Sequence, residues 1–124
     1  MLQRDDIAQI IEDYDRMKLR IGMTASHSAL DICDGGIEEG FPTVAYCQEG
    51  RHKTYANYFK TKRSSSGRVL RGMVDKAIVM PSFNDVMNDS MQVEMRKRNV
   101  VYIPNRSFTS YSSIEDVENK FRVP

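Results

Sequence analysis

The spacing of apolar residues along the chain alternates between a helical and an extended pattern. Residues 5–17 carry an apolar side chain every three or four positions, which predicts a helix with one apolar face. Its members are Ile7, Ile10, Ile11, Tyr14 and Met17. Residues 19–24 form a short apolar run instead, which predicts a strand. Helical spacing then returns after Ser26, the expected N-cap, and ends at Glu39-Gly40. Its apolar face is Ala29, Leu30, Cys33 and Ile37.

The alternation continues to the end of the chain. Further strands are expected at 41–47, 75–80, 100–104 and 121–124, the last of which only begins before the sequence stops. A long helix should run from a cap at Ser82 or Asn84 to about Asn99. Its apolar stripe is Val86, Met87, Met91 and Met95. A shorter helix capped by Ser112 or Ser113 should run through Val117. Strands alternating with helices over short connections predict one α/β domain, residues 1–124, with a Rossmann-like parallel sheet of four to five strands flanked by helices.

Composition adds few constraints to this fold. The chain has 124 residues and a formal net charge of +1, so bulk charge does not indicate a nucleic-acid binder. It has no apolar run near the roughly 18 residues of a membrane span and no apolar signal core, which predicts a cytoplasmic protein that does not engage a membrane. Cys33 and Cys47 form no C-x-x-C pair and lack histidines at zinc spacing. They are expected to be buried free thiols.

Two polar clusters follow predicted strands. Ser26, His27 and Ser28 come after the strand at 19–24, and Asn105, Arg106, Ser107 and Thr109 come after the strand at 100–104. The carboxyl ends of parallel strands share one sheet edge, so the clusters converge if these two strands lie close. Hydroxyls, an imidazole, a guanidinium and helix N-terminal amides together suit a phosphorylated small molecule. Helix capping and turn formation are the structural alternative for each cluster taken alone, less so for His27, because a turn needs no histidine.

Other site chemistries find no support in the sequence. It lacks G-x-G-x-x-G after the first strand, a Walker A motif and a nucleophile elbow. His27 and His52 are the only histidines, and neither stands in a metal-ligand pattern.

Residues 51–71 carry seven cations and no acid, and Tyr55, Tyr58 and Phe59 interleave with them. This pattern is typical of an RNA-binding surface, but also of a solvated loop or hairpin turning at Ser64-Ser65-Ser66-Gly67. Following the second strand, the segment could also border the ligand crevice.

Several collinear motifs resemble the archaeal PurP family, the FAICAR synthetases of purine biosynthesis. They are IGMTASHSAL at 21–30, GIEEGFPTVA at 36–45, EGRHKTY at 49–55, RKRNVVYIPNRSFTSY at 96–111 and ENKFRVP at 118–124. The family's glycine before Ser26 is Ala25 here, and its H-G before Ser107 is Asn105-Arg106. The family also lacks part of the basic segment.

The resemblance implies an N-terminal, Rossmann-like pre-ATP-grasp domain of a ligase that joins formate to AICAR through formyl phosphate. It implies that His27 and Ser107 hold the AICAR phosphate or ribose, and we expect Ser26, Ser28 and Arg106 to support them. No catalytic, metal or cofactor site is expected in this chain. ATP and Mg²⁺ or Mn²⁺ would bind an ATP-grasp region that residues 1–124 do not include. That region or subunit is an expected partner, as is a homo-oligomer. The alternative to a ligase domain is a stand-alone phospho-ligand sensor or regulatory subunit.

Overall fold

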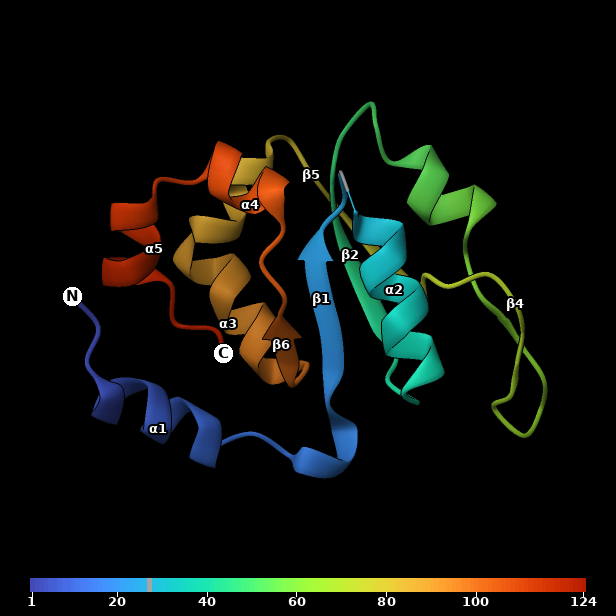
Figure 1. Ribbon diagram of the computed structural model, residues 1–124, viewed down its shortest axis with the longest axis horizontal. Coiled ribbons are helices and arrows are strands. Elements are labelled where there is room, and N and C mark those ends of the chain that lie inside the picture. The colour runs from blue at the N-terminus through green and yellow to red at the C-terminus, as the bar shows by residue number, and fades with distance from the viewer. Residues whose placement is uncertain (27) are drawn as a thin grey trace.

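Four parallel strands form the central sheet, in the order β5-β2-β1-β6 (Figure 1). The strands are β1 Arg20–Thr24, β2 Thr43–Gln48, β5 Lys76–Met80 and β6 Val100–Tyr102. This computed structural model describes residues 1–26 and 28–124, the side chain of Ser107 excepted. The predicted α/β class and parallel sheet are confirmed. A strand at 121–124 is not: the sheet formed by the described residues has four strands.

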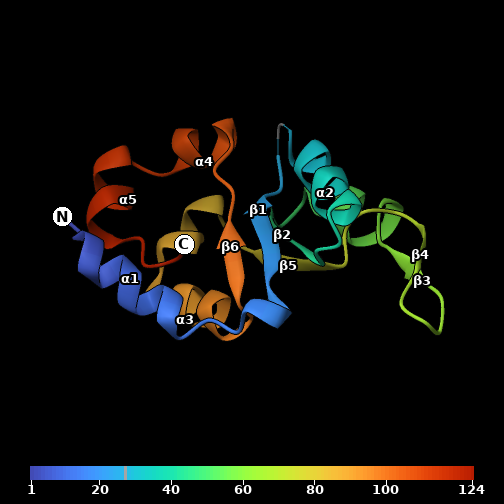
Figure 2. The ribbon, with the colours of Figure 1, turned by 60° about the horizontal axis from the view of Figure 1, so that its bottom comes forward.

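Helices cover both faces of the sheet, and Figure 2 shows the sheet edge-on between the two layers. Helix α2 (Ala29–Glu38) covers one face, while α3 (Asp89–Lys97), α4 (Arg106–Tyr111) and α5 (Ile114–Lys120) lie on the other. Alternation along β2 supplies both cores, because successive side chains of a strand point to opposite faces. Val44 and Tyr46 pack in the α3 and α4 layer, whereas Ala45 and Cys47 pack beneath α2. Cys33 and Cys47 are buried free thiols, as predicted.

The N-terminal helix is shorter than the predicted 5–17. Helix α1 covers Arg4–Glu12, and a separate 3₁₀ turn, η1, covers Arg16–Lys18. Asp15 is extended between them, where its carboxylate accepts a hydrogen bond from the Met17 amide at 2.9 Å. Its own amide donates to Asn99 Oδ1, also at 2.9 Å. The helix therefore ends before this contact with a distant loop. Met17 is 92% exposed and does not belong to a buried helix face.

The predicted helix from Ser82 or Asn84 to Asn99 is two elements. A 3₁₀ helix, η3 (Phe83–Met87), begins at the predicted cap Ser82, and α3 begins only at Asp89. Between them, Asn88 is extended, with a ψ angle of 138°. The Met87 carbonyl accepts a hydrogen bond from Gln92 Nε2 at 2.9 Å instead of continuing a helical ladder.

Residues 105–124 differ most from the predicted pattern. Helix α4 was not predicted, whereas α5 begins after the predicted cap Ser113 and extends past Val117 to Lys120. Phe121 and Val123 are buried in the core beside α3 and β6. The Pro124 carbonyl accepts one hydrogen bond from the Tyr102 amide, at 2.7 Å. The last residues therefore pack beside β6 without forming the predicted strand.

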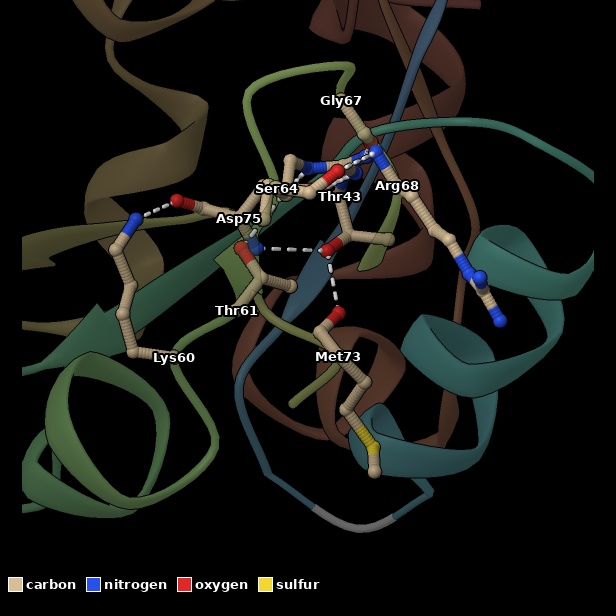
Figure 3. A network of polar contacts seen from close by, with 9 residues as sticks. Thr43, Lys60, Thr61, Ser64, Gly67, Arg68, Met73 and Asp75 are labelled. Atoms are coloured by element: carbon tan, nitrogen blue, oxygen red, sulfur yellow. Dashed lines mark hydrogen bonds and ion pairs between the residues drawn. The ribbon is translucent and has the colours of Figure 1, made fainter. Parts of the chain in front are cut away.

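The basic segment folds as a π-helical turn, η2 (Thr54–Tyr58), and a small antiparallel hairpin. The hairpin strands are β3 Lys62–Arg63 and β4 Val69–Arg71, and the predicted turn lies at its tip, where Gly67 has a φ angle of +89°. Asp75 ties the hairpin to the sheet through the polar network of Figure 3. Among the described residues, no helix has the length and apolar character needed to cross a membrane.

Candidate functional site

The two polar clusters meet because β1 and β6 are neighbours in the sheet. Their parallel register pairs Gly22 with Tyr102, so the loops that follow both strands leave the same edge. Asn105 Nδ2 donates to the Thr24 carbonyl oxygen at 2.9 Å and to the Ser26 carbonyl oxygen at 3.3 Å. We refer to Ser26, Ser28, Asn105 and Arg106 as the carboxyl-edge site.

Asn105 is the residue that joins the two loops. It is 9% exposed, and its Oδ1 accepts a hydrogen bond from the Phe108 amide at 3.0 Å, which caps α4. One side chain therefore sets both the spacing of the loops and the start of a helix. The sequence placed Asn105 among the polar residues of its cluster without identifying this role. Asparagine is a common N-cap residue, so Asn105 three residues before the apolar Phe108 could have been predicted to cap a helix.

The serines of the first loop occupy different environments. The N-cap of α2 is Ser28, not the predicted Ser26, and the Ser28 backbone is left-handed, with a φ angle of 55°. Within the described part of the chain, the Ser28 side chain makes no capping bond. Its hydroxyl is exposed, whereas Ser26 is half-buried and uses its carbonyl to accept from the Ala29 amide at 3.1 Å. Ser28 is thus an exposed residue at this edge, where a ligand contact is sterically open.

The second loop contributes an exposed cation. Arg106 is the first residue of α4, and its carbonyl accepts from the hydroxyls of Thr109 and Ser110 at 3.0 and 2.9 Å. These bonds use only the backbone of Arg106. His27 lies outside the described residues, as does the side chain of Ser107, so these two predicted ligand contacts stay predictions.

Buried aromatic residues pack next to the carboxyl-edge site. The hydroxyls of Thr24 and Tyr102 share a buried hydrogen bond of 2.6 Å. The Tyr102 ring packs against Phe108, with ring centroids 5.0 Å apart, and Phe108 packs against Phe121 at 5.2 Å. Burial raises the pKa of Tyr102, so its phenol stays protonated and acts as a fixed structural group.

The donor set at this edge suits a phosphate better than a metal ion. A guanidinium, a hydroxyl and the N-terminal amides of α2 are hydrogen-bond donors to an anion. Across the described residues, no group of three or more His, Cys, Asp or Glu side chains is placed to hold a metal.

Two cations of the basic segment make structural contacts. Arg63 makes a two-pronged ion pair with Asp75, at 2.8 Å from both Nε and Nη2, and Lys60 Nζ donates to the Asp75 carbonyl. Tyr55 and Phe59 pack against the core beneath α2, while Tyr58 is 81% exposed. Two of the three aromatic residues that favoured RNA binding therefore contribute to packing rather than to an exposed surface. The other five cations of the segment, Arg51, Lys53, Lys62, Arg68 and Arg71, are exposed.

Comparison with known proteins agrees with the resemblance found in the sequence. A family model described as "Protein of unknown function (DUF1246)" matches residues 21–124. The chain belongs to the DUF1246 family. Its matched segment includes both loops of the carboxyl-edge site.

Curated proteins similar to this chain include synthetases. The chain is 32% identical over 120 residues to the 5-formaminoimidazole-4-carboxamide-1-(beta)-D-ribofuranosyl 5'-monophosphate synthetase of Methanobrevibacter smithii, covering 97% of this chain and 30% of that protein. The synthetase of the same name from Methanopyrus kandleri is 34% identical over 124 residues, covering 100% of this chain and 31% of that protein. The chain thus spans about 30% of the length of these curated relatives.

A solved structure shares this fold. A crystal structure of an IMP biosynthesis protein PurP from Thermococcus kodakaraensis matches with a TM-score of 0.57 and 27% sequence identity. The match covers 83% of this chain and 27% of that one. The resemblance to the PurP family is confirmed, over 27–31% of the length of these proteins.

Proposed function

We propose that this chain is the N-terminal, substrate-binding domain of an ATP-dependent ligase that joins formate to AICAR and yields FAICAR in IMP biosynthesis. The observation that carries the proposal is the bond from Asn105 to the Thr24 and Ser26 carbonyls, which holds two donor-rich loops together at one sheet edge. The family relatives bear the name of the synthetase for this product.

In this proposal the chain binds and orients the nucleotide. His27 and Ser107 contact the phosphate or ribose of AICAR, with Ser28 and Arg106 as further donors and Ser26 shaping the loop. Each of these side chains acts by hydrogen bonding or charge, and none forms a covalent bond to the substrate. An ATP-grasp region or subunit supplies the sites for ATP and for Mg²⁺ or Mn²⁺. The working enzyme is a cytoplasmic homo-oligomer, and residues 1–124 alone bind AICAR weakly without turnover.

Calorimetry with AICAR tests this site. His27→Ala and Ser107→Ala should each weaken binding by about tenfold, the loss expected for one hydrogen bond to a charged group. Lys18→Ala is the control, because Lys18 lies in η1, which precedes β1 at the opposite, amino edge of the sheet. The dephosphorylated riboside should bind much more weakly than AICAR. Equal binding of AICAR by the wild type and both site variants would contradict the proposal.

A second comparison separates the ligase domain from a sensor. A ligase domain should prefer AICAR over ribose 5-phosphate and AMP, because the imidazole carboxamide is the reacting part of the substrate. Equal affinity for all three phosphorylated compounds would indicate a general phospho-ligand sensor instead.

A further inference from the structure

An open depression of about 550 Å³ lies at the amino edge of the sheet, opposite the carboxyl-edge site. This edge comes forward in Figure 2, where η1 leads into β1. Five cations line the depression: Arg16, Lys18, Arg20, Lys97 and Arg98. We call it the amino-edge depression. A second hollow of about 300 Å³ shares Arg20, Pro42 and Arg98 with it and adds one cation, Lys76, and one carboxylate, Asp75.

Positive charge is concentrated in the amino-edge depression far beyond the average of the chain. The whole sequence has 18 basic and 17 acidic residues, yet the described lining of the depression contains five cations and no carboxylate. Two of the five have acidic neighbours: Arg98 pairs with Glu94 at 2.9 Å, and Lys18 lies 4.0 Å from Asp15. Arg16, Arg20 and Lys97 form no ion pair with any described residue.

A purely structural role accounts for only part of this cluster. Lys97 belongs to the last turn of α3 and Arg98 is its C-cap, where cations stabilise the negative end of the helix dipole. Arg20 is the first residue of β1, so its charge does not stabilise the end of an α-helix dipole. Unpaired like charges held around one hollow repel each other, which makes a bound anion favourable there.

The size and lining of the amino-edge depression favour a compact ligand over a macromolecule. A volume of about 550 Å³ is within the range of small-molecule sites. Guanidinium groups bind phosphate oxygens in a two-pronged geometry, and half-buried Phe41 adds an apolar wall. Single-stranded nucleic acid needs a series of aromatic platforms, but Phe41 is the single aromatic residue of the described lining.

We propose that the amino-edge depression binds a compact anion carrying two or more phosphate groups, either a free polyphosphate or a nucleoside triphosphate. Arg16, Arg20 and Lys97 provide the unpaired charges. The site is independent of the carboxyl-edge site, because Arg20 and Thr24 at the two ends of β1 are about 13 Å apart at the usual rise per strand residue. A ligand bound in the amino-edge depression would occupy a second anion site and would not compete with AICAR for the carboxyl-edge site.

Titration calorimetry with tripolyphosphate and with GTP, at low salt and without divalent cations, tests the proposal. The triple variant Arg16→Gln/Arg20→Gln/Lys97→Gln should raise Kd by about tenfold or more, the loss expected for even one charge-assisted bond. The matched control Lys62→Gln/Arg68→Gln/Arg71→Gln removes the same charge from the exposed hairpin and should leave Kd nearly unchanged. Tighter binding of GTP than of tripolyphosphate would identify a nucleotide as the ligand, and equal binding would identify the phosphate chain.

An equal loss of affinity in both triple variants would overturn the proposal, because bulk charge would then explain binding. Absence of binding by the wild type would also overturn it. An NMR titration of the wild type needs no variant to fold: the amides of Gly40, Phe41 and Asn99 should shift on adding tripolyphosphate. Shifts confined to Ser26, Ser28 and Arg106 would contradict the amino-edge site while leaving the AICAR site intact.

Discussion

Asn105 Nδ2 donates a hydrogen bond across the carboxyl edge of the sheet to the carbonyl oxygen of Thr24, at 2.9 Å. The bond connects the end of β1 with the loop that follows β6, two segments about eighty positions apart in the sequence. Asn105 also caps α4 through Phe108. A buried amide with both a donating and an accepting role makes the geometry of the site dependent on one residue.

Replacing Asn105 by aspartate separates these two roles. The introduced carboxylate would still accept from the Phe108 amide, but its second oxygen would face the Thr24 and Ser26 carbonyls without a proton to share. We expect Asn105→Asp to lower the free energy of unfolding by about 2 kcal/mol, the cost of a lost buried bond and its unpaired acceptor. Urea denaturation measures this change. Asn88→Ala is the control, since Asn88 caps α3 without a side-chain bond and should cost little.

Asp75 should make the stability of the protein sensitive to acid. Burial alone would raise its pKa, but hydrogen bonds from Arg63, Thr61 and the Thr43 amide outweigh burial, and the pKa of Asp75 lies below its usual value. The folded chain therefore binds this proton less readily than the unfolded chain. The stabilisation is complete above the unfolded value of about 3.9 and is lost as pH falls through the lower folded value.

The variant Asp75→Asn removes this acid dependence and the charge that holds Arg63. We expect it to lower the free energy of unfolding at pH 7 by about 2 kcal/mol, within the range for hydrogen bonds to charged groups. Thermal unfolding between pH 7 and about pH 2 should show a smaller decline below about pH 4 for Asp75→Asn than for the wild type. Asp34→Asn, at an exposed position of α2, should reproduce the wild-type profile. A variant profile parallel to that of the wild type would refute the assignment.

Alanine substitutions at two glycines, Gly22 and Gly35, should change the free energy of unfolding in opposite directions. A Cβ at Gly22 would lie 2.6 Å from Val100 Cγ1 and 3.2 Å from Tyr46 Cε2, both in the buried core. Gly22→Ala should therefore destabilise the protein by about 1–3 kcal/mol through overpacking. A Cβ at Gly35, on the exposed side of α2, would meet nothing within 4 Å. Gly35→Ala should stabilise it by about 0.5–1 kcal/mol, the helix-propensity difference, as urea denaturation of both variants would show.

The two cysteines should react only when the protein opens. Burial raises the pKa of Cys33 and of Cys47 to about 12 each. At pH 8 the folded chain therefore holds almost no thiolate, and a disulfide reagent should label it at the rate of unfolding. Above about pH 8.5 the unfolded chain releases thiol protons that the folded chain retains, so the free energy of unfolding should fall as pH rises. Rapid labelling of both thiols without denaturant would contradict their burial.

Agreement between the predicted and observed elements depends on how local their determinants are. The strands at 19–24 and 75–80 and the cap at Ser113 follow from neighbouring residues, and the structure contains them with small shifts of bounds. The break at Asn88 does not. It coincides with a bond from Gln92 Nε2 to Met87 O, while Gln92 Oε1 accepts from the Arg122 amide at 2.8 Å. A contact with a residue thirty positions away does not change the local spacing of apolar residues, so this spacing cannot predict the break.

The sequence by itself determined the α/β class, the parallel sheet and the polar residues at the ends of two strands. Apolar periodicity reports which side of each element is buried, and short connections between strands and helices restrict the topology. Only the tertiary structure decided that β1 and β6 are adjacent and that Asn105 joins their loops. Strand order and loop pairing depend on contacts between segments that are distant in the sequence. The apolar pattern of a single element does not reveal the free energy of those contacts.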